Sequence, residues 1–188
     1  IFNITNSASA QLQPEQVNQA VLKDCAHFHV MGSSLFSFRI IDAMKKAIEI
    51  VKAQGGTVSF DPNVRKEMLR IPEMREALAY ILEFTDIVLP SGHEVTQLAR
   101  SADEAGAIAE IFARGVREIV VKRGADGCSY FSADERIDLD ALAVDVADPT
   151  GAGDCFGATF IACRRLGKTA LQSLRYANAA GALAVSSK

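Results

Sequence analysis

The chain has 188 residues, of which 49% are hydrophobic, and this composition excludes intrinsic disorder and predicts a globular protein with a sizeable core. Lys and Arg number 20 against 23 Asp and Glu, giving a formal net charge of −3. Because there is also no long basic run, this balance excludes nucleic-acid binding over the whole surface and favours small-molecule chemistry.

Short apolar runs alternate with segments of helical period from residue 26 to residue 122. Strands are expected at residues 27–31, 57–60, 86–90 and 118–122. Helices are expected between them at residues 38–54, 72–84 and 102–115. Such alternation is typical of βαβ units and predicts an α/β fold with a mostly parallel central sheet.

The pattern changes after residue 122. Residues 124–131 and 136–144 are expected to form two strands joined by a polar turn, which would add an antiparallel edge. Two helices rich in small residues follow at 154–167 and 169–187. Since there is no repeat, linker or low-complexity tract, residues 1–188 are interpreted as a single domain.

Capping residues are expected at the starts of two helices. Ser101 and Glu104 have the spacing of a capping box, in which each side chain bonds a backbone amide of the first turn. Thr169 is expected to be the N-cap of the last helix.

A glycine-rich loop, Ala-Asp-Pro-Thr-Gly-Ala-Gly-Asp at residues 147–154, leads into the first of the two final helices. A helix start attracts anions through its free amides and its dipole, and glycine lets a phosphate approach the backbone. Gly151, Ala152 and Gly153 are therefore candidate phosphate-binding amides. The alternative is a tight turn that binds no ligand.

The acidic residue that ends this loop, Asp154, distinguishes between the possible functions of the loop. A Walker loop requires Lys and then Ser or Thr where Asp154 and Cys155 stand, so that interpretation fails. A carboxylate would repel a permanently bound phosphate, but it can accept the proton of a hydroxyl that attacks a phosphate in transit. Asp154 is therefore a candidate general base, with a simple helix cap as the alternative.

Asp148 to Asp154 reads Asp-x-x-Gly-Ala-Gly-Asp and resembles the signature of the ribokinase, or pfkB, family of carbohydrate and nucleoside kinases. The resemblance implies that Asp154 is the catalytic base and that Gly151, Ala152 and Gly153 form an anion hole. It also implies a ribokinase-like fold, with helices on both faces of the sheet and the antiparallel edge near the nucleotide.

Two further stretches resemble family elements that contact substrate and metal. Phe-Asp-Pro-Asn-Val-Arg is similar to the Asp-x-Asn-x-Arg loop, which implies a place near the substrate and the transferred phosphate for three residues: Asp61, Asn63 and Arg65. Residues 91–94 resemble the Asn-x-x-Glu element, although Ser91 replaces its asparagine. Glu94 would then bind Mg²⁺ through water. A Pro-Asn turn and a helix-start glutamate are the alternatives.

The nucleotide region is implied by two weaker similarities. Residues 120–131 resemble the strand and glycine turn along the nucleotide, which gives contact roles to Lys122, Gly124 and Gly127. Asn178 matches the polar residue of the late helix that borders the adenine. Asp148 would border a monovalent-cation site as in potassium-dependent relatives. The alternatives are an ordinary turn for the glycines, a surface amide for Asn178 and a cap for Asp148.

The resemblance predicts ATP-dependent phosphorylation of a hydroxyl group on a sugar or sugar acid, with ATP, Mg²⁺ and, in a potassium-dependent variant, K⁺. The Phe-Asp-Pro-Asn-x-Arg form is closest to 2-keto-3-deoxygluconate kinases and fructokinases, and the lack of a cation before Lys23 leaves a neutral sugar open. A non-catalytic nucleotide or sugar sensor is the alternative. A nicotinamide-dependent oxidoreductase is disfavoured because no acid follows Asp154.

Family members are longer, so this chain is expected to be their nucleotide-binding and catalytic part, without the N-terminal strands and the small β-lid. A homodimer through that lid is expected, and partners other than sugar and ATP, such as nucleic acid or a membrane, are not.

The cysteines and histidines are expected to be structural. Four widely spaced cysteines without a Cys-x-x-Cys pair, and the lack of a signal peptide or membrane-spanning run, predict a cytoplasmic protein. Cys155 is expected to be a small core residue. His27 and His29 alternate on one face of a strand, and hydrogen-bonded histidines are favoured there over a zinc site.

Overall fold

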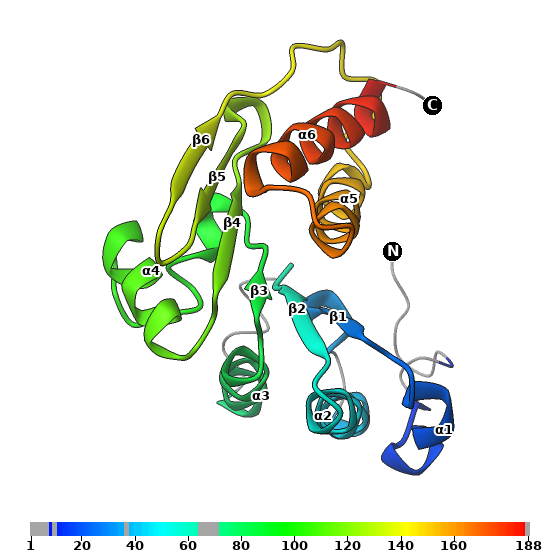
Figure 1. Ribbon diagram of the computed structural model, residues 1–188. Helices are drawn as coiled ribbons and strands as arrows, with labels where there is room; N and C mark the ends of the chain where they lie inside the picture. The colour runs from blue at the N-terminus through cyan, green and yellow to red at the C-terminus, as the bar shows by residue number, and fades with distance from the viewer. Residues whose placement is uncertain (1–7, 9–10, 36–37, 64–71, 187–188) are drawn as a thin grey trace. The chain divides into compact units, whose positions relative to one another are not determined.

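The computed structural model describes residues 8, 11–35, 38–63 and 72–186 (Figure 1). They form two compact units, of which the first comprises residues 1–88 and 93–117 and the second residues 89–92 and 118–188. Among the described residues, no helix combines the length and the apolar character needed to cross a membrane.

The first unit contains three parallel strands. Its elements are η2 (Pro14–Gln16), α1 (Gln19–Leu22), β1 (His27–Met31), η3 (Gly32–Ser34), α2 (Phe38–Ala53), β2 (Thr57–Asp61), α3 (Pro72–Glu83), β3 (Ile87–Val88) and α4 (Glu104–Ala113). Strand β1 pairs with β2, and β2 pairs with β3, both in parallel. This pairing confirms the parallel βαβ arrangement that the alternating pattern predicts.

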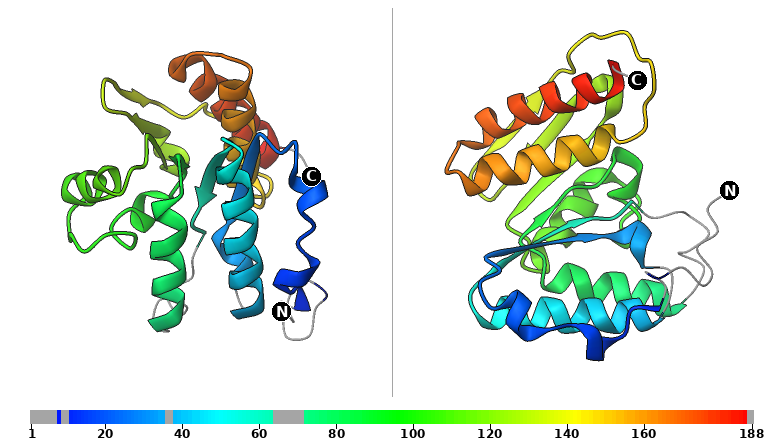
Figure 2. Two further views of the ribbon diagram at one scale, coloured as in Figure 1. Left: turned by 60° about the horizontal axis from the view of Figure 1, so that its bottom comes forward. Right: turned by 90° about the vertical axis from the view of Figure 1, so that its right-hand side faces the viewer.

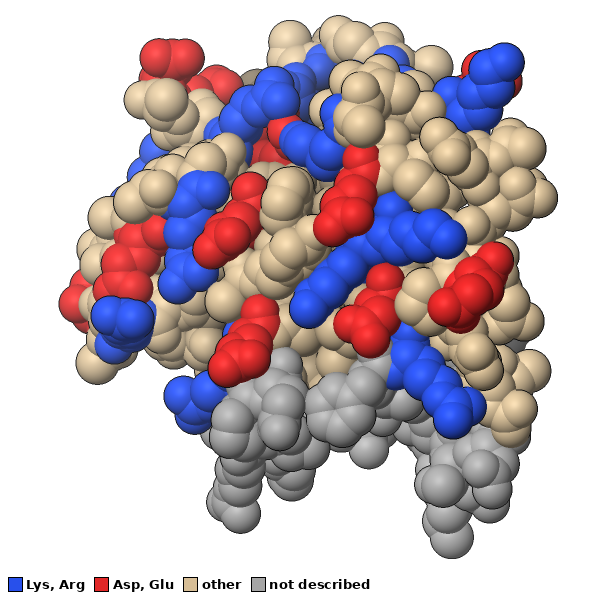
Figure 3. Space-filling model, turned by 90° about the horizontal axis from the view of Figure 1, so that it is seen from below, with Lys and Arg blue, Asp and Glu red and all other residues tan. Residues whose placement is uncertain are grey.

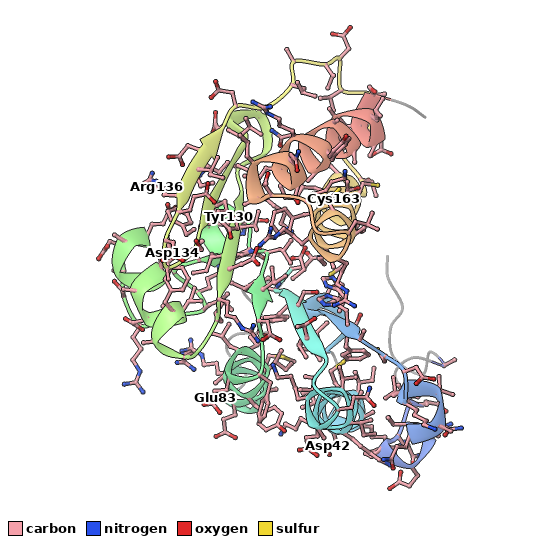
Figure 4. The ribbon with its side chains drawn as sticks, in the orientation of Figure 1. Asp42, Glu83, Tyr130, Asp134, Arg136 and Cys163 are labelled. Carbon is pink, nitrogen blue, oxygen red and sulfur yellow. The ribbon has the colours of Figure 1, made fainter. Side chains whose placement is uncertain are left out.

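Helix α3 shows why this pattern folds as it does. Its buried residues follow the spacing of one helix face and are Met74, Ala77, Leu78, Ile81 and Leu82. In Figure 4, Asp42 of α2 and Glu83 of α3 lie on the opposite, outer sides of their helices, and both are exposed. The apolar faces therefore cover the strands, and each fully buried Leu or Ile contributes about 1.5–3 kcal/mol.

A buried carboxylate ties the first unit together. Asp86, which precedes β3, accepts hydrogen bonds from Val58 N at 2.7 Å, Lys52 Nζ at 2.9 Å and Arg117 Nη2 at 2.6 Å. Burial alone would raise the pKa of Asp86, but the hydrogen bonds from Lys52 and Val58 and the charges of Lys52 and Arg117 outweigh it and hold the pKa below its ordinary value. This cluster joins α2, β2 and the start of β3.

The two histidines of β1 are hydrogen-bonded to β2, as the sequence predicts. His27 contacts Thr57 Oγ1 through Nδ1 at 2.7 Å and Ser59 Oγ through Nε2 at 2.8 Å. His29 Nδ1 lies 2.7 Å from the same Ser59 Oγ. The polar face of these strands is therefore cross-linked by side chains.

The second unit combines an antiparallel hairpin pair with two helices. Its elements are β4 (Glu118–Lys122), η6 (Gly124–Asp126), β5 (Cys128–Phe131), β6 (Arg136–Leu139), α5 (Ala152–Arg165) and α6 (Ala170–Ser186). Strand β5 pairs antiparallel with both β4 and β6, which confirms the predicted antiparallel strands. Helices α5 and α6 lie side by side against these strands (Figures 1 and 2).

The core of the second unit is formed where α5 meets the sheet. The rings of Tyr130 on β5 and Phe160 on α5 lie 6.2 Å apart, and Cys163 of α5 is also buried (Figure 4). Near the C-terminal end of α5, Arg164 forms a bidentate ion pair with Glu118, with N to O distances of 3.0 and 2.9 Å. This pair fixes the C-terminal end of α5 to the start of β4.

Several local expectations are wrong in detail. The N-cap of α4 is Asp103, whose side chain accepts from Gly106 N, whereas the Ser101 hydroxyl donates to Asp103 Oδ2. Strand β6 ends at Leu139 because its partner β5 begins at Cys128, opposite Leu139. Cys155, expected in the core, is exposed in the first turn of α5, because the buried face of that helix begins at Phe156.

Charge on the protein surface is mixed. On the face seen in Figure 3, the described Lys and Arg side chains are interspersed with Asp and Glu. This distribution agrees with the near balance of acidic and basic residues in the sequence.

Candidate active site

The glycine loop is the N-terminal approach to α5. Gly151 is the N-cap and has a φ of 83°, a left-handed conformation that glycine adopts without strain. The first helical hydrogen bond of this turn runs from Cys155 N to Gly151 O at 2.9 Å. The amides before Cys155 therefore precede the helical ladder, which is the arrangement that attracts an anion. The Ala152 amide also makes a long turn contact with Pro149 O, at 3.4 Å.

Asp154 lies in the first turn of α5 and is exposed. Its carboxylate is thus at the positive end of the helix dipole and beside the loop amides. The N-cap position belongs to Gly151 rather than to Asp154. Asp154 is therefore not the N-cap of α5, so the structure does not support the simple helix cap that was the alternative to a catalytic role.

Asp148 begins the loop with a turn. Its Oδ1 accepts a hydrogen bond from Thr150 N at 2.9 Å, and the side chain is exposed. The hydrogen bonds from the Thr150 backbone and side chain lower the pKa of Asp148, so that it stays ionised at neutral pH. The turn alternative is thus present in the structure, and cation binding stays a prediction.

Lys122 lies against this loop from the end of β4. A Cβ placed on Gly153 would be 3.6 Å from Lys122 Nζ, so the lysine side chain reaches the first turn of α5. The structure therefore brings together Lys122 and the glycine loop, two elements that are 31 positions apart in the sequence.

The other predicted nucleotide residues have local structural roles. Gly124 and Gly127 have φ values of 59° and 89° in the turn between β4 and β5. A Cβ on Gly127 would lie 2.0 Å from Leu139 O, so this position admits only glycine without a shift. Asn178 Nδ2 donates to Asp140 O at 2.9 Å. Nucleotide contacts at these residues stay predictions.

The predicted substrate residues belong to the first unit. Asp61 ends β2 and is 2% exposed, whereas Asn63 is exposed with a φ of 36° and its amide contacts Met31 Sδ at 3.8 Å. A Cβ on Gly32 would lie 1.7 Å from Pro62 O, so the loops after β1 and β2 pack closely. Arg65 lies outside the described residues.

Glu94, the predicted indirect Mg²⁺ ligand, ends the short helix η5 (Gly92–Glu94) and is 4% exposed. A carboxylate oxygen is the ligand type that Mg²⁺ prefers, and Mg²⁺ binding by Glu94 through water stays a prediction. His93 beside it is exposed.

Comparison with known proteins identifies the family. The model of the pfkB family of carbohydrate kinases matches residues 1–188. Probable fructokinase-2 of Arabidopsis thaliana is 29% identical over 198 residues, which cover 100% of this chain and 60% of that protein. Fructokinase-2 of Zea mays is 28% identical, and the match covers 100% of this chain and 59% of that protein. The chain thus spans about three fifths of the length of these curated relatives.

Comparison with solved structures gives the same family and also the fold. An E. coli protein provisionally named Ribokinase II, solved both alone and in complex with ATP and Mg²⁺, is 56% identical with a TM-score of 0.98 over 100% of this chain and 61% of that one. A fructokinase from Vibrio cholerae O395, solved with fructose, ADP and calcium, is 27% identical with a TM-score of 0.75 over 86% and 55%. The fold is therefore ribokinase-like α/β, and the chain belongs to the pfkB family of carbohydrate kinases.

Proposed function

We propose that the full-length protein transfers the γ-phosphoryl group of ATP to a hydroxyl group of a sugar or sugar acid. The proposal rests on the glycine loop of this pfkB family chain. Gly151 has a left-handed conformation at the start of α5, and Asp154 is exposed in the first turn of that helix. Phosphoryl transfer requires a base near the attacking hydroxyl and donors near the phosphate oxygens, and this loop offers both.

In the proposed reaction, the sugar oxygen forms a bond to the γ-phosphorus while the bond from that phosphorus to the β,γ-bridging oxygen breaks. Asp154 accepts the hydroxyl proton, and ADP leaves with the bridging oxygen. The backbone amides of Gly151, Ala152 and Gly153 neutralise charge on the transferring group. Lys122, which reaches Gly153, places a further positive charge beside the nucleotide phosphates.

The remaining predicted residues receive their roles from the family pattern. Asp61, Asn63 and Arg65 would orient the sugar and the transferred phosphate, and Gly124, Gly127 and Asn178 would border the nucleotide. Glu94 would hold Mg²⁺ through water. When bound, Mg²⁺ would offset the negative charge of the ATP phosphates. The complex of the E. coli relative with ATP and Mg²⁺ supports both ligands.

The substrate is proposed to resemble fructose or 2-keto-3-deoxygluconate. Fructokinases among the relatives support the ketose, and the sugar-acid alternative rests on the sequence form of the Asp61 loop. ADP release by the full-length protein should be measured with ketoses, aldoses, 2-keto-3-deoxygluconate and nucleosides. Turnover on one sugar supports the proposal, whereas ATP binding without turnover on any acceptor would favour the nucleotide or sugar sensor.

Two further properties can be measured in the same preparation. We propose that K⁺ binds beside Asp148, whose ionised carboxylate offers the oxygen ligand that such a cation prefers, so replacing K⁺ by tetramethylammonium should lower the rate. Light scattering on the full-length protein tests the expected homodimer.

A further inference from the structure

The segment from Asp140 to Gly151, which carries the start of the glycine loop, has neither helix nor strand, and most of its residues are exposed. It leaves β6 at Leu139 and enters α5 at Ala152. A catalytic loop must nevertheless be held to within a fraction of an ångström. The question is which part of the second unit supplies that support.

One face of α6 contacts this segment at its start and beyond its middle, and also faces the first turn of α5 that follows it. Asn178, Gly181 and Val185 are separated by three and four positions, so they lie on the same side of the helix. Asn178 Nδ2 donates to Asp140 O at 2.9 Å. Figures 1 and 2 show the segment passing from β6 over the C-terminal end of α6 before it turns into α5.

The strongest of these contacts is at the loop entry. Val185 O accepts hydrogen bonds from Ala147 N at 2.7 Å and from Asp148 N at 3.2 Å. Val185 is in the last turn of α6, where carbonyl groups have no helical partner. The end of α6 thus obtains its missing donors from the residues that begin the glycine loop.

At the loop exit, Gly181 faces the first turn of α5. A Cβ on Gly181 would lie 3.5 Å from Ala152 O and 3.7 Å from Phe156 Cβ. Both distances are ordinary van der Waals contacts, so alanine fits, but the atoms of a larger side chain would meet Ala152 or Phe156. The backbone of α6 therefore lies directly against the residue that precedes Gly153 and Asp154.

We propose that Gly181 and the Val185 carbonyl are positioning elements, which set the geometry of the loop amides and of Asp154 without touching substrate. This inference rests on the proposed kinase function. A side chain that pushes α6 away at Gly181 displaces the start of α5, and a displacement of about 1 Å costs on the order of 100-fold in rate.

The test compares Gly181→Val with Ala177→Val in the full-length protein. Ala177 lies one turn earlier on α6 and is 0% exposed, so valine there overpacks the helix at a position other than Gly181. We expect Gly181→Val to lower kcat on the order of 100-fold more than Ala177→Val does. The KM for sugar and the melting temperature should change by similar amounts in the two variants.

A graded series makes the result independent of one variant. If Gly181→Val does not fold, Gly181→Ser adds one atom beyond Cβ and should still lower kcat more than Gly181→Ala. Equal kcat values across this series, or equal losses in Gly181→Val and Ala177→Val, would overturn the positioning role alone. A full-length protein that turns over no acceptor would instead overturn the proposed kinase function, and the positioning role with it.

Discussion

Two aspartates show how differently the two units use a carboxylate. Asp86 of the first unit is 5% exposed and accepts from a backbone amide, a lysine and an arginine. Asp154 of the second unit is exposed at the start of α5. A carboxylate saturated by donors stabilises the fold and resists protonation, whereas an exposed one beside loop amides can accept a proton from a substrate. Burial and donor number therefore separate the structural acid from the candidate base.

The largest expected effect is that of replacing the exposed aspartate, Asp154. Asp154→Asn should lower kcat by about 10²–10⁴-fold, because the amide cannot accept the hydroxyl proton. ATP affinity and melting temperature should stay close to those of the unsubstituted protein. Initial rates and nucleotide titration measure the two properties, with Asp134→Asn, an exposed acid in the β5–β6 turn, as the matched control. A comparable loss of ATP affinity would argue against the role of base.

Removal of the buried carboxylate should act on stability instead. Asp86→Ala leaves Val58 N and Lys52 without their acceptor, and we expect the free energy of unfolding to fall by about 2–3 kcal/mol. Arg117 is 70% exposed and can be solvated, which limits the loss. Urea unfolding measures the change against Asp42→Ala, an exposed position on α2. An equal loss in both variants would remove the distinction between the two aspartates.

The pH dependence of stability sharpens the same distinction. The pKa of Asp86 is lowered from 3.8 in the folded protein, so its contribution is fully present above pH 3.8 and is lost as pH falls through the lower folded value. The difference in unfolding free energy between the unsubstituted protein and Asp86→Asn should thus be constant well above pH 3.8 and shrink as pH falls below it. A difference that grows on acidification would contradict the lowered pKa.

Local patterns in the sequence predict much of this fold. The runs at 27–31 and 118–122 are β1 and β4 with the same bounds, and α2 ends one residue earlier than expected. The predicted N-cap of α6, Thr169, is confirmed, since its hydroxyl accepts a hydrogen bond from Gln172 N at 3.2 Å. These features depend on neighbouring residues only, and apolar period and capping residues therefore reveal them.

Features that depend on distant partners could not be predicted. Nothing near Asp86 in the sequence indicates that Lys52 and Arg117 meet it, and Gly181 gives no signal beyond being one more small residue in a helix. The glycine loop is different because its motif is contiguous, so the candidate base and amides were found from the sequence. Their support by α6 was not, since it joins residues more than 25 positions apart.

The smallest expected effect compares two ion pairs of the second unit. The Glu118–Arg164 pair is bidentate, with side chains 17% and 28% exposed, whereas Arg136 and Asp138 on β6 are 65% and 57% exposed. Water screens the second pair strongly, so Arg136→Gln should change the unfolding free energy by less than about 0.5 kcal/mol. Glu118→Gln should cost about 1 kcal/mol, because Arg164 then loses a charged acceptor in a partly buried place.

Both variants keep Asp154 and the glycine loop, so kcat per folded molecule should remain within about twofold of the unsubstituted value while the two losses in stability differ. Urea unfolding and initial rates on the same samples give the comparison. If Glu118→Gln lowered kcat as strongly as Gly181→Val, the support of α5 would extend along the whole helix. The contacts at Gly181 and Val185 would then be one part of that support, and the far end of α5 would act on the catalytic loop as well.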